Sequence, residues 1–311
     1  MKIAFLYAGQ GSQHPGMGAD LYEAYPEFRA VLDSAQAQVD FDLKTAMFSD
    51  PEGVLDQTEY TQPCMVAFAA GMTAILYNKG IRPDYAAGLS LGEYSALCAA
   101  GVFTAKQAVE LAAFRGKAMA AAAAGVPCGM TAVLGLDRDK LRAACEAAAS
   151  EGVVEIANYN CPGQLVIGGQ KAAVDAAAAK AKELGAKRCL PLKVSGPFHT
   201  SLLAPAGDAL RERFKTEPFG EMQFPVLFNC LGHEMGEGDT VPALLERQVQ
   251  SSVYMEDTIR RMAELGVEMI VEIGPGKVLS GFVKKTVPAI KTCAVETCAD
   301  IDALCEALKG E

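Results

Sequence analysis

The sequence predicts an α/β protein with a mainly parallel sheet, interrupted by an inserted unit of a different strand order. Apolar segments of strand length alternate with segments of helical periodicity along most of the chain. Between residues 128 and 194 this alternation is replaced by the order β-α-β-β-α-β. Half of the 311 residues are hydrophobic, so one large domain or a domain with a smaller companion can be buried.

The first 127 residues alternate strands and helices. We expect a buried strand at 2–8 followed by a Gly-rich loop, helices at 21–39 and from 61 to 78, a short strand at 85–88, and helices from 91 and at 104–124. Pro63 near the first turn and Gly80 past the end are typical helix boundaries.

The inserted unit is predicted over 128–194. Strands are expected at 130–136, 153–159, 164–168 and 187–194, and helices at 137–150 and 171–184. This is the ferredoxin-like order, which makes 128–194 a subdomain between the two parts of a core domain, 1–127 and 195–311.

The remaining chain returns to alternation. A helix near 201–215, a strand at 225–229, a helix at 243–262, a strand at 267–273 and a helix up to 285 are expected. Strands that alternate with helices imply a mainly parallel sheet covered on both faces.

Charge and composition exclude several classes of protein. The net charge of −10 argues against general nucleic-acid binding, which needs a basic surface. The ten cysteines include no C-x-x-C pair, and several lie in apolar helical patterns, so we expect reduced core residues. The N-terminal apolar run is too short for a signal peptide, and no segment approaches the ~20 apolar residues of a membrane span. We therefore expect a cytoplasmic protein that binds neither membranes nor nucleic acid.

The segment AGLSLGEY contains the pentapeptide G-x-S-x-G, which allows two interpretations of Ser90. On a strand–turn–helix, the motif presents a nucleophilic serine, and the amide of Leu91 then points at a developing oxyanion. Alternatively, Ser90 and Glu93 form a capping box at the start of a helix. The local sequence leaves both interpretations open.

A serine nucleophile needs a base, and the chain has three histidines. His14 lies in the first Gly-rich loop and His233 in a polar turn, whereas His199 follows the inserted unit in the segment GPFH. His199 is the best candidate. The Asp residues between Ser90 and His199 belong to predicted helices, which favours a Ser/His dyad over a triad.

The loop GQGSQ after the first strand fails the tests for nucleotide binding. His14 stands where a dinucleotide fingerprint requires its third Gly, and no Lys-Ser/Thr follows as in a Walker A loop. The amide of Gln10 is a candidate second oxyanion donor. The later stretch GPGK also lacks Walker spacing and indicates a tight strand-to-helix turn.

Arg115 is the only arginine in the helix predicted at 104–124, in an apolar context. An arginine in this setting binds a carboxylate or phosphate bidentately. The alternative is a structural ion pair with Glu110 or another acid.

Six motifs in order resemble one family. They are GQGSQ, GLSLGEY, RGKAM, NYNCPGQLVIGG, GPFH and EIGPGKVL. Together they resemble the malonyl-CoA:acyl carrier protein transacylases, acyltransferases of bacterial fatty acid synthesis, over essentially the whole chain. The resemblance implies an α/β-hydrolase-like core with a ferredoxin-like subdomain.

The resemblance also implies roles for individual residues. Ser90 corresponds to the acylated nucleophile and His199 to its base, with the amides of Gln10 and Leu91 as the oxyanion hole. The resemblance also implies substrate-binding residues. Arg115 pairs with the malonyl carboxylate, and the main-chain carbonyl of Gln248 orients the histidine. Phe198 is typical of malonyl selectivity, and Asn160 lies near the site together with Asn158.

Two departures from the family pattern stand out. Many members have His where this chain has Leu89, and SSVYM follows Gln248 in place of the usual Asn-Pro pattern. Leu89 flanks the nucleophile and is not the base, so acylation should persist.

The activity implied is ping-pong transfer of malonyl from malonyl-CoA to the phosphopantetheine thiol of acyl carrier protein, by a monomer without metal or redox cofactor. A serine hydrolase or thioesterase, the acyltransferase of a polyketide pathway, and a carrier-binding protein without catalysis are the alternatives. Because the carrier is acidic in this family, exposed basic residues should bind it. The candidates are Lys187, Arg188, Lys193, Lys284 and Lys285. Alternatively, these residues are scattered charges that only keep the protein soluble.

Overall fold

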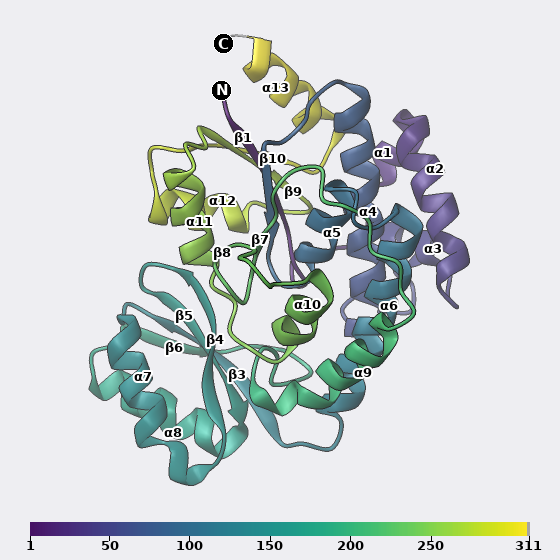
Figure 1. Ribbon diagram of the computed structural model, residues 1–311. Helices are drawn as coiled ribbons and strands as arrows, with labels where there is room; N and C mark the ends of the chain where they lie inside the picture. Colours follow the sequence, from purple (N-terminus) through teal and green to yellow (C-terminus); the bar gives the residue numbers. More distant parts are fainter. Residues whose placement is uncertain (310–311) are drawn as a thin grey trace. The chain divides into compact units, whose positions relative to one another are not determined.

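The computed structural model describes residues 1–309, which form two compact units (Figure 1). The first unit contains Met1–Gly116, Phe219–Phe228 and the chain from Arg261 onward. The second contains Lys117–Pro218 and Asn229–Arg260. Two helices continue from one unit into the other, α6 (Ala105–Ala123) and α11 (Met255–Glu264).

The first unit is built on a parallel sheet of four strands. In spatial order they are β10 (Lys291–Val295), β9 (Met269–Ile273), β1 (Ile3–Tyr7) and β2 (Tyr85–Gly88). The strand β1 is in the middle, pairing Ala4 with Tyr85 on one side and with Ile270 on the other. Its residues from Ala4 to Tyr7 are completely buried, as expected for a strand with both faces covered. The prediction of a mainly parallel sheet is confirmed for this unit.

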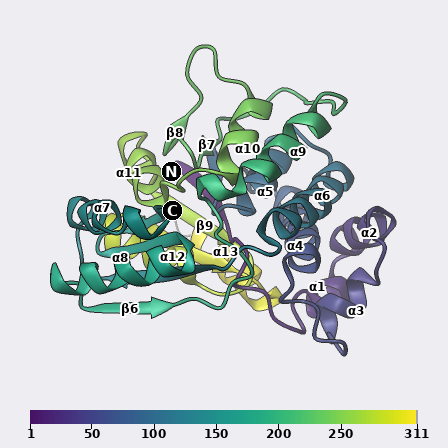
Figure 2. The same cartoon turned by 90° about the horizontal axis from the view of Figure 1, so that it is seen from below.

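Helices cover both sides of this sheet. They are α1 (Ala19–Ala24), α2 (Pro26–Ala35), α3 (Leu43–Phe48), α4 (Thr58–Asn78), α5 (Gly92–Ala99), α12 (Val278–Thr286) and α13 (Cys298–Lys309). Figures 1 and 2 show α4 and α5 on one side and α12 on the other. The short strand β7 (Leu227–Phe228) also belongs to this unit, and Val226 beside it forms a parallel bridge with Ala86.

The second unit contains an antiparallel sheet and two helices. The spatial order is β4 (Val154–Cys161), β5 (Gln164–Gln170), β3 (Cys128–Leu134) and β6 (Arg188–Pro191). The helices α7 (Arg138–Ala147) and α8 (Lys171–Glu183) lie side by side, as Figure 2 shows. Val133, Leu141, Ile167 and Val174 form part of the apolar core between the sheet and the helices.

Further elements also belong to the second unit. They are η3 (Ser201–Leu203), α9 (Ala204–Phe214), β8 (His233–Glu234) and α10 (Val241–Val249). The chain after α10 bonds to the edge of β4, because Val253 N donates to Ala157 O and Tyr159 N donates to Val253 O, both at 2.8 Å. This pairing anchors the C-terminal end of α10 to the antiparallel sheet.

Two helices that were predicted to be continuous are interrupted in the structure, so both predictions are wrong at the break. The helix expected at 21–39 is interrupted at Tyr25, which is extended because Pro26 follows it and begins α2. The helix expected at 243–262 is interrupted between Val249 and Met255, where the backbone bonds to β4 instead. The loss of helical bonds there is compensated by the pairing with the sheet.

Two general features concern residues 1–309. No helix in that range is both long enough and apolar enough to cross a membrane. All ten cysteines are free thiols. Burial raises the pKa of the Cys64 and Cys98 thiols to about 12, which keeps both as thiols at neutral pH.

Candidate active site

Ser90 lies in a tight turn between a strand and a helix. The strand β2 ends at Gly88 and α5 begins at Gly92. Ser90 itself has a φ of 52°, a left-handed conformation that is strained for a residue with a side chain. Only two other non-glycine residues, His199 and Asp50, share a positive φ among the described residues.

The two glycines of the pentapeptide are required by close backbone approach. A Cβ on Gly88 would lie 2.0 Å from the Gly92 carbonyl carbon, and a Cβ on Gly92 would lie 2.3 Å from the oxygen of Tyr7. The turn therefore folds onto itself and onto the end of β1. This geometry is the strand–turn–helix context that the motif requires.

The capping-box interpretation of Ser90 is wrong. The residue that caps α5 is Leu91, which has no side-chain capping bond, and Ser90 lies outside the helix with its positive φ. A residue that caps a helix through its side chain usually has an extended backbone, whereas Ser90 is left-handed.

The loop after β1 lies directly against this turn. A Cβ on Gly9 would lie 2.4 Å from the oxygen of Leu89, and the amide of Leu89 donates to Tyr7 O at 2.9 Å. Among residues 1–309, the amides of Gln10 and Leu91 have no hydrogen-bond acceptor. These are the two N–H groups expected to bind an oxyanion, and no acceptor within residues 1–309 competes for them.

Arg115 is fully buried and points to the serine. Its Nη2 donates to Ser90 Oγ at 3.1 Å, and its Nη1 donates to Gln62 Oε1 at 2.9 Å. Burial lowers the pKa of the guanidinium from its ordinary value, while Tyr94 and Glu93 raise it. Glu110 is exposed on α6, whereas the carboxylate of Glu93 is buried and acts on the guanidinium. The alternative of a structural ion pair with an acid of the chain therefore stays a hypothesis.

Gln62 is a residue that the sequence analysis did not single out. It is buried in α4, accepts from Arg115, and donates from Nε2 to Gln10 Oε1 at 3.4 Å. Gln10 Nε2 in turn donates to Thr58 Oγ1 at 3.0 Å. A polar chain therefore runs from the first loop through α4 to Arg115 and Ser90. In the sequence, the only indication of a role for Gln62 was that it is a polar residue in the apolar stretch of a predicted buried helix.

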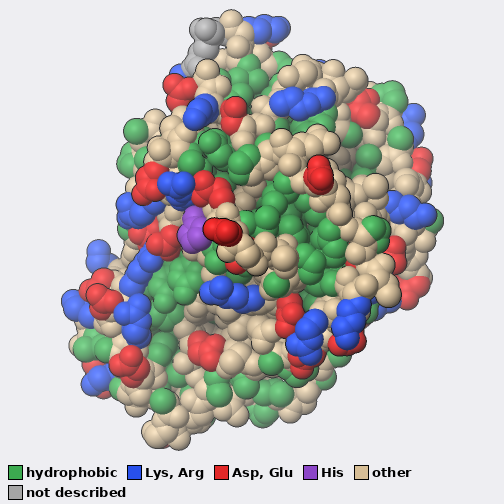
Figure 3. Space-filling view, in the orientation of Figure 1, with side chains coloured by type: hydrophobic (Ala, Val, Ile, Leu, Met, Phe, Trp, Pro, Cys, Tyr) green, Lys and Arg blue, Asp and Glu red, His purple; other side chains and the backbone are tan. Residues whose placement is uncertain are grey.

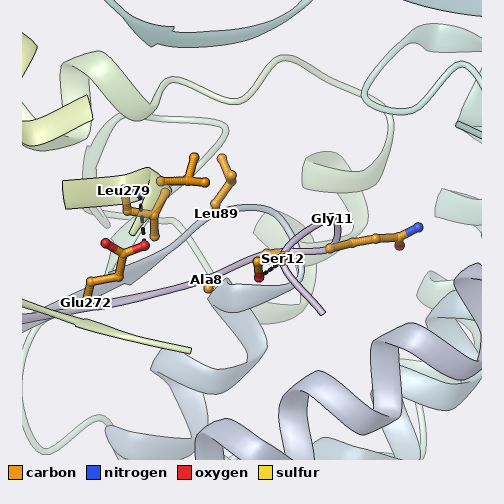
Figure 4. Close-up of a pocket in the computed structure, with 9 residues that line it drawn as sticks. Ala8, Gly11, Ser12, Leu89, Glu272 and Leu279 are labelled. Carbon is orange, nitrogen blue, oxygen red and sulfur yellow. Dashed lines mark hydrogen bonds between the residues drawn. The ribbon is translucent and has the colours of Figure 1, made fainter. Parts of the chain in front are cut away.

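A cavity of about 120 Å³ opens beside the turn. Figure 4 shows Gly11 and Ser12 of the first loop on one side, Leu279 and Glu272 on the other, and Leu89 between them. The Glu272 carboxylate accepts the amides of Leu279 and Ser280 at 2.9 and 2.7 Å, which fixes the first turn of α12. Leu89, the residue that departs from the family pattern, thus makes an apolar wall of this cavity.

His199 lies in the second unit, buried, with a φ of 59°. Its Nδ1 and the main-chain carbonyl of Gln248 are 2.9 Å apart. Because a carbonyl only accepts, Nδ1 carries the hydrogen and Nε2 of the neutral ring is left as the basic nitrogen.

The position of Gln248 explains why its carbonyl is available. It is the penultimate residue of α10, and the last carbonyls of a helix lack partners within the helix. The negative end of the helix dipole also favours a positive charge on the imidazole ring. Thr200 Oγ1 donates to Pro197 O at 2.6 Å, which closes the turn that holds His199.

The two remaining site candidates also belong to the second unit. Phe198 is buried and packs on Gly196, where a Cβ would lie 2.8 Å from its ring. Asn160 lies on β4, and its buried Oδ1 has no hydrogen-bond partner within residues 1–309. A buried carbonyl oxygen of this kind is rare in a stable protein and is typical of a group that receives a ligand or water.

The acids considered for a triad have other partners. Asp137 caps α7 by accepting the amide of Lys140 at 2.9 Å, as its predicted helix start requires. Asp139 pairs with Arg142, and Asp175 pairs with Lys171. The structure thus brings Ser90 together with Arg115 in the first unit and His199 together with Gln248 in the second.

Comparisons with known proteins agree with these features. The family model described as "Acyl transferase domain" matches residues 4–300. The malonyl CoA-acyl carrier protein transacylase of Bacillus subtilis (strain 168) is 40% identical over 311 residues, which are 100% of this chain and 98% of that protein.

Solved structures give the same result. The malonyl CoA-acyl carrier protein transacylase from Clostridium perfringens Atcc 13124 matches with a TM-score of 0.97 and 36% identity, over 100% of this chain and 98% of that chain. A complex of a type II polyketide synthase acyl-carrier protein with its malonyl-transacylase contains a chain that matches with a TM-score of 0.95 and 37% identity, over 99% of this chain and 100% of that chain. The chain therefore belongs to the family of the malonyl CoA-acyl carrier protein transacylases, within the acyl transferase domain family.

Proposed function

We propose that this acyltransferase moves malonyl from malonyl-CoA to the phosphopantetheine thiol of acyl carrier protein, through a malonyl ester on Ser90, in fatty acid biosynthesis. The observation that carries the proposal is the buried guanidinium of Arg115, bonded to Ser90 Oγ at 3.1 Å. The curated relative from Bacillus subtilis carries the matching name over the full length of this chain.

In the first half-reaction His199 Nε2 accepts the hydroxyl proton of Ser90, whose oxygen attacks the thioester carbonyl of malonyl-CoA. The amides of Gln10 and Leu91 donate to the oxyanion of the tetrahedral intermediate. The C–S bond then breaks, and the imidazolium returns its proton to the CoA thiolate. Gln248 O holds the Nδ1 hydrogen of the ring throughout both proton transfers.

In the second half-reaction the carrier's thiol gives its proton to His199 and attacks the malonyl ester. The same amides bind the second oxyanion, and Ser90 recovers its proton as the C–O bond breaks. The steps use side chains and amides of the chain itself, and malonyl-CoA enters as substrate.

Selectivity for a dicarboxylic acyl group follows from Arg115. In a malonyl ester on Ser90, a single methylene group separates the ester carbonyl from the free carboxylate. The carboxylate is therefore within reach of a guanidinium that already contacts Ser90 Oγ. The hydrogen bonds between the guanidinium and the malonyl carboxylate are charge-assisted. A neutral acetyl group leaves the buried cation without this partner. Phe198, adjacent to the base, and Asn160, with its buried oxygen, are proposed to shape the acyl pocket.

The fold is proposed to combine an α/β-hydrolase-like core, 1–127 and 195–311, with a ferredoxin-like subdomain, 128–194. The strand order β4-β5-β3-β6 and the chain order of β3, α7, β4, β5, α8 and β6 support the second part. The turn at Ser90, after a parallel strand, supports the first.

The carrier protein is proposed to dock through basic side chains. Lys187, Arg188 and Lys193 in the second unit and Lys284 and Lys285 in the first are all exposed. On the face shown in Figure 3, however, Lys and Arg side chains are interspersed with Asp and Glu. Reversing the charge of any single one of these residues should therefore change the rate of transfer to the carrier only slightly.

We propose that the protein acts as a cytoplasmic monomer, on small molecules and the carrier alone.

A second candidate has the same chemistry in another pathway. The solved complex of a similar chain with a type II polyketide synthase carrier favours a polyketide carrier as an acceptor. Hydrolysis by water is the third candidate, since the dyad alone would permit it.

One experiment separates these candidates. The protein is incubated with malonyl-CoA and with either a fatty-acid or a polyketide carrier in its phosphopantetheinylated form, and malonyl-carrier and free malonate are measured together. The proposal predicts malonyl-carrier in proportion to CoA released, fastest with the fatty-acid carrier. Release of malonate without malonyl-carrier would indicate a hydrolase.

A further inference from the structure

Glu296 joins two loops that arise from different strands of the parallel sheet. It follows β10 directly, and its Oε2 accepts the amide of Gly276, in the loop after β9, at 2.9 Å. Its Oε1 lies 2.5 Å from His14 Nε2, in the loop after β1. One carboxylate therefore connects the carboxyl ends of three neighbouring strands in the order β10-β9-β1.

The contacts of His14 require a charged ring. Its Nδ1 lies 3.0 Å from the carbonyl of Pro15, and its Nε2 faces the Glu296 carboxylate. Both of these groups only accept, so both ring nitrogens must carry hydrogen for the two contacts to form. The Pro15 carbonyl and then Glu296 raise the pKa of His14 above its ordinary value, in agreement with this geometry.

The loop after β1 and the start of α12, which directly follows the loop after β9, are walls of the cavity beside the Ser90 turn. Residues 9–12 line one side of it, and Val278 and Leu279 line the other. The first wall carries Gln10, whose amide is the proposed oxyanion donor, four residues before His14.

Hydrogen bonds within the loop connect the residues between Gln10 and His14. Ser12 Oγ donates to Gly9 O at 3.0 Å, and the amide of Gly11 donates to Gln13 Oε1 at 2.7 Å. Gln13 Nε2 also donates to Asp56 Oδ1 at 2.7 Å. The Gln10 side chain is held on Thr58 and Gln62, so the attachment at His14 is expected to act on the main chain of the loop, which carries the Gln10 amide.

We propose that His14 and Glu296 are positioning residues for acyl transfer. They form an ion pair that holds the loop at residues 9–14, which carries the Gln10 amide, against the loop at 274–277, and this pair weakens when His14 loses its proton. The inference rests on the proposed function, because it takes the Gln10 amide as an oxyanion donor. Neither residue touches the substrate; both act through Gln10.

The direction of the pH effect follows from the charges around the ring. Glu296 faces His14 directly, Asp300 accepts the amides of Glu296 and Thr297, and Lys277 acts on Asp300. Since the pKa of His14 is raised on folding, the pair is fully formed below about pH 6.5 and is lost as the pH rises through the raised value. The rate of Ser90 acylation should therefore show a decline on the alkaline side.

The test combines kinetics with NMR titration of the His14 ring. Single-turnover acylation of Ser90 by malonyl-CoA is followed by mass spectrometry from pH 6 to 9 in wild type, Glu296→Gln and His14→Gln. We expect an alkaline decline in wild type whose midpoint equals the pKa of His14 from NMR, no such decline in His14→Gln, and in Glu296→Gln a fall of the His14 pKa towards about 6.5. His233→Gln is the control, because His233 is an exposed histidine bonded to the Glu234 carbonyl; its profile should match wild type.

The outcomes separate a positioning role from a structural one. A pair that only stabilises the fold would lower the melting temperature in both variants and leave the shape of the pH profile unchanged, which would overturn the proposal. A pKa of His14 at or below 6.5 in wild type would also overturn it. If no variant or wild type forms malonyl-Ser90, the proposed function fails instead, while the NMR titration still reports whether the ion pair exists.

Discussion

The guanidinium of Arg115 donates a hydrogen bond to the hydroxyl of Ser90 at 3.1 Å, in a position where the arginine is completely buried. A charged group without exposure to water is unfavourable unless polar groups surround it. Gln62 and Ser90 accept hydrogen bonds from the guanidinium, and the buried side chains of Tyr94 and Glu93 also act on it. We propose that the carboxylate of a malonyl group is a further partner. We propose that this relationship links the nucleophile to substrate selection within one unit of the protein.

Replacing Arg115 by Ala should weaken malonyl transfer and relax the discrimination against acetyl-CoA. A hydrogen bond to a charged group contributes about 1.5–3 kcal/mol, so kcat/KM for malonyl-CoA should fall roughly 10- to 150-fold. Initial rates with both thioesters measure the change. Arg142→Ala removes an exposed arginine as the control, and unchanged selectivity in Arg115→Ala would exclude the arginine from substrate recognition.

Gln62 allows a sharper test of the same network. In Gln62→Leu, the Arg115 Nη1 bond is lost, so the melting temperature should fall with the rate. In Gln62→Glu, a carboxylate of the same size neutralises Arg115 and competes with the malonyl group. We expect Gln62→Glu to fold well but to transfer malonyl more slowly than Gln62→Leu, and the reverse order would contradict a substrate role for Arg115.

The close packing of the turn at Ser90 predicts that alanine at Gly92 and alanine at Gly281 have very different effects on stability. In Gly92→Ala the new Cβ would lie 2.3 Å from Tyr7 O, so the turn must shift and the protein should lose several kcal/mol of stability. Gly281→Ala is the matched control, because Gly281 lies in α12 and nothing is within 4 Å of the added carbon. Alanine there should be neutral or stabilising by up to about 1 kcal/mol. Urea unfolding of both variants measures the difference, and equal midpoints would refute the close approach.

The contact of His199 with Gln248 O predicts one tautomer. In the neutral ring the hydrogen should reside on Nδ1, because the carbonyl at 2.9 Å accepts it. Long-range ¹H–¹⁵N correlation spectra of the free enzyme distinguish the two forms. A ring that carries its hydrogen on Nε2 could not act as the base for Ser90, and this result would require another base.

The sequence predicted those elements whose local pattern matches their environment. The strand predicted at 85–88 and the helix predicted at 171–184 agree with the observed boundaries within one residue, because buried strands and Ala-rich helices have strong periodic patterns. The pentapeptide marked the turn, since its glycines are needed for close approach. The strand β10 and the helix α13 were not expected, because β10 is a half-exposed edge strand whose pattern is weak.

Tertiary bonds explain what the sequence could not show. The break after Val249 exists because residues near Val253 pair with β4, a partner almost a hundred residues away. Gln62 has no motif around it, and its role follows only from the position of Arg115. The N-cap of α5 at Leu91 depends on the positive φ of Ser90, which no composition rule indicates.

The most direct test of the account is the intact mass of the protein after incubation with malonyl-CoA. Wild type should gain one malonyl group, Ser90→Ala should gain none, and added carrier protein should remove the group from wild type with formation of malonyl-carrier. An acetyl-CoA sample should give much less adduct in wild type. Absence of the adduct from wild type, or the same adduct on Ser90→Ala, would contradict the central claim that Ser90 carries the transferred acyl group.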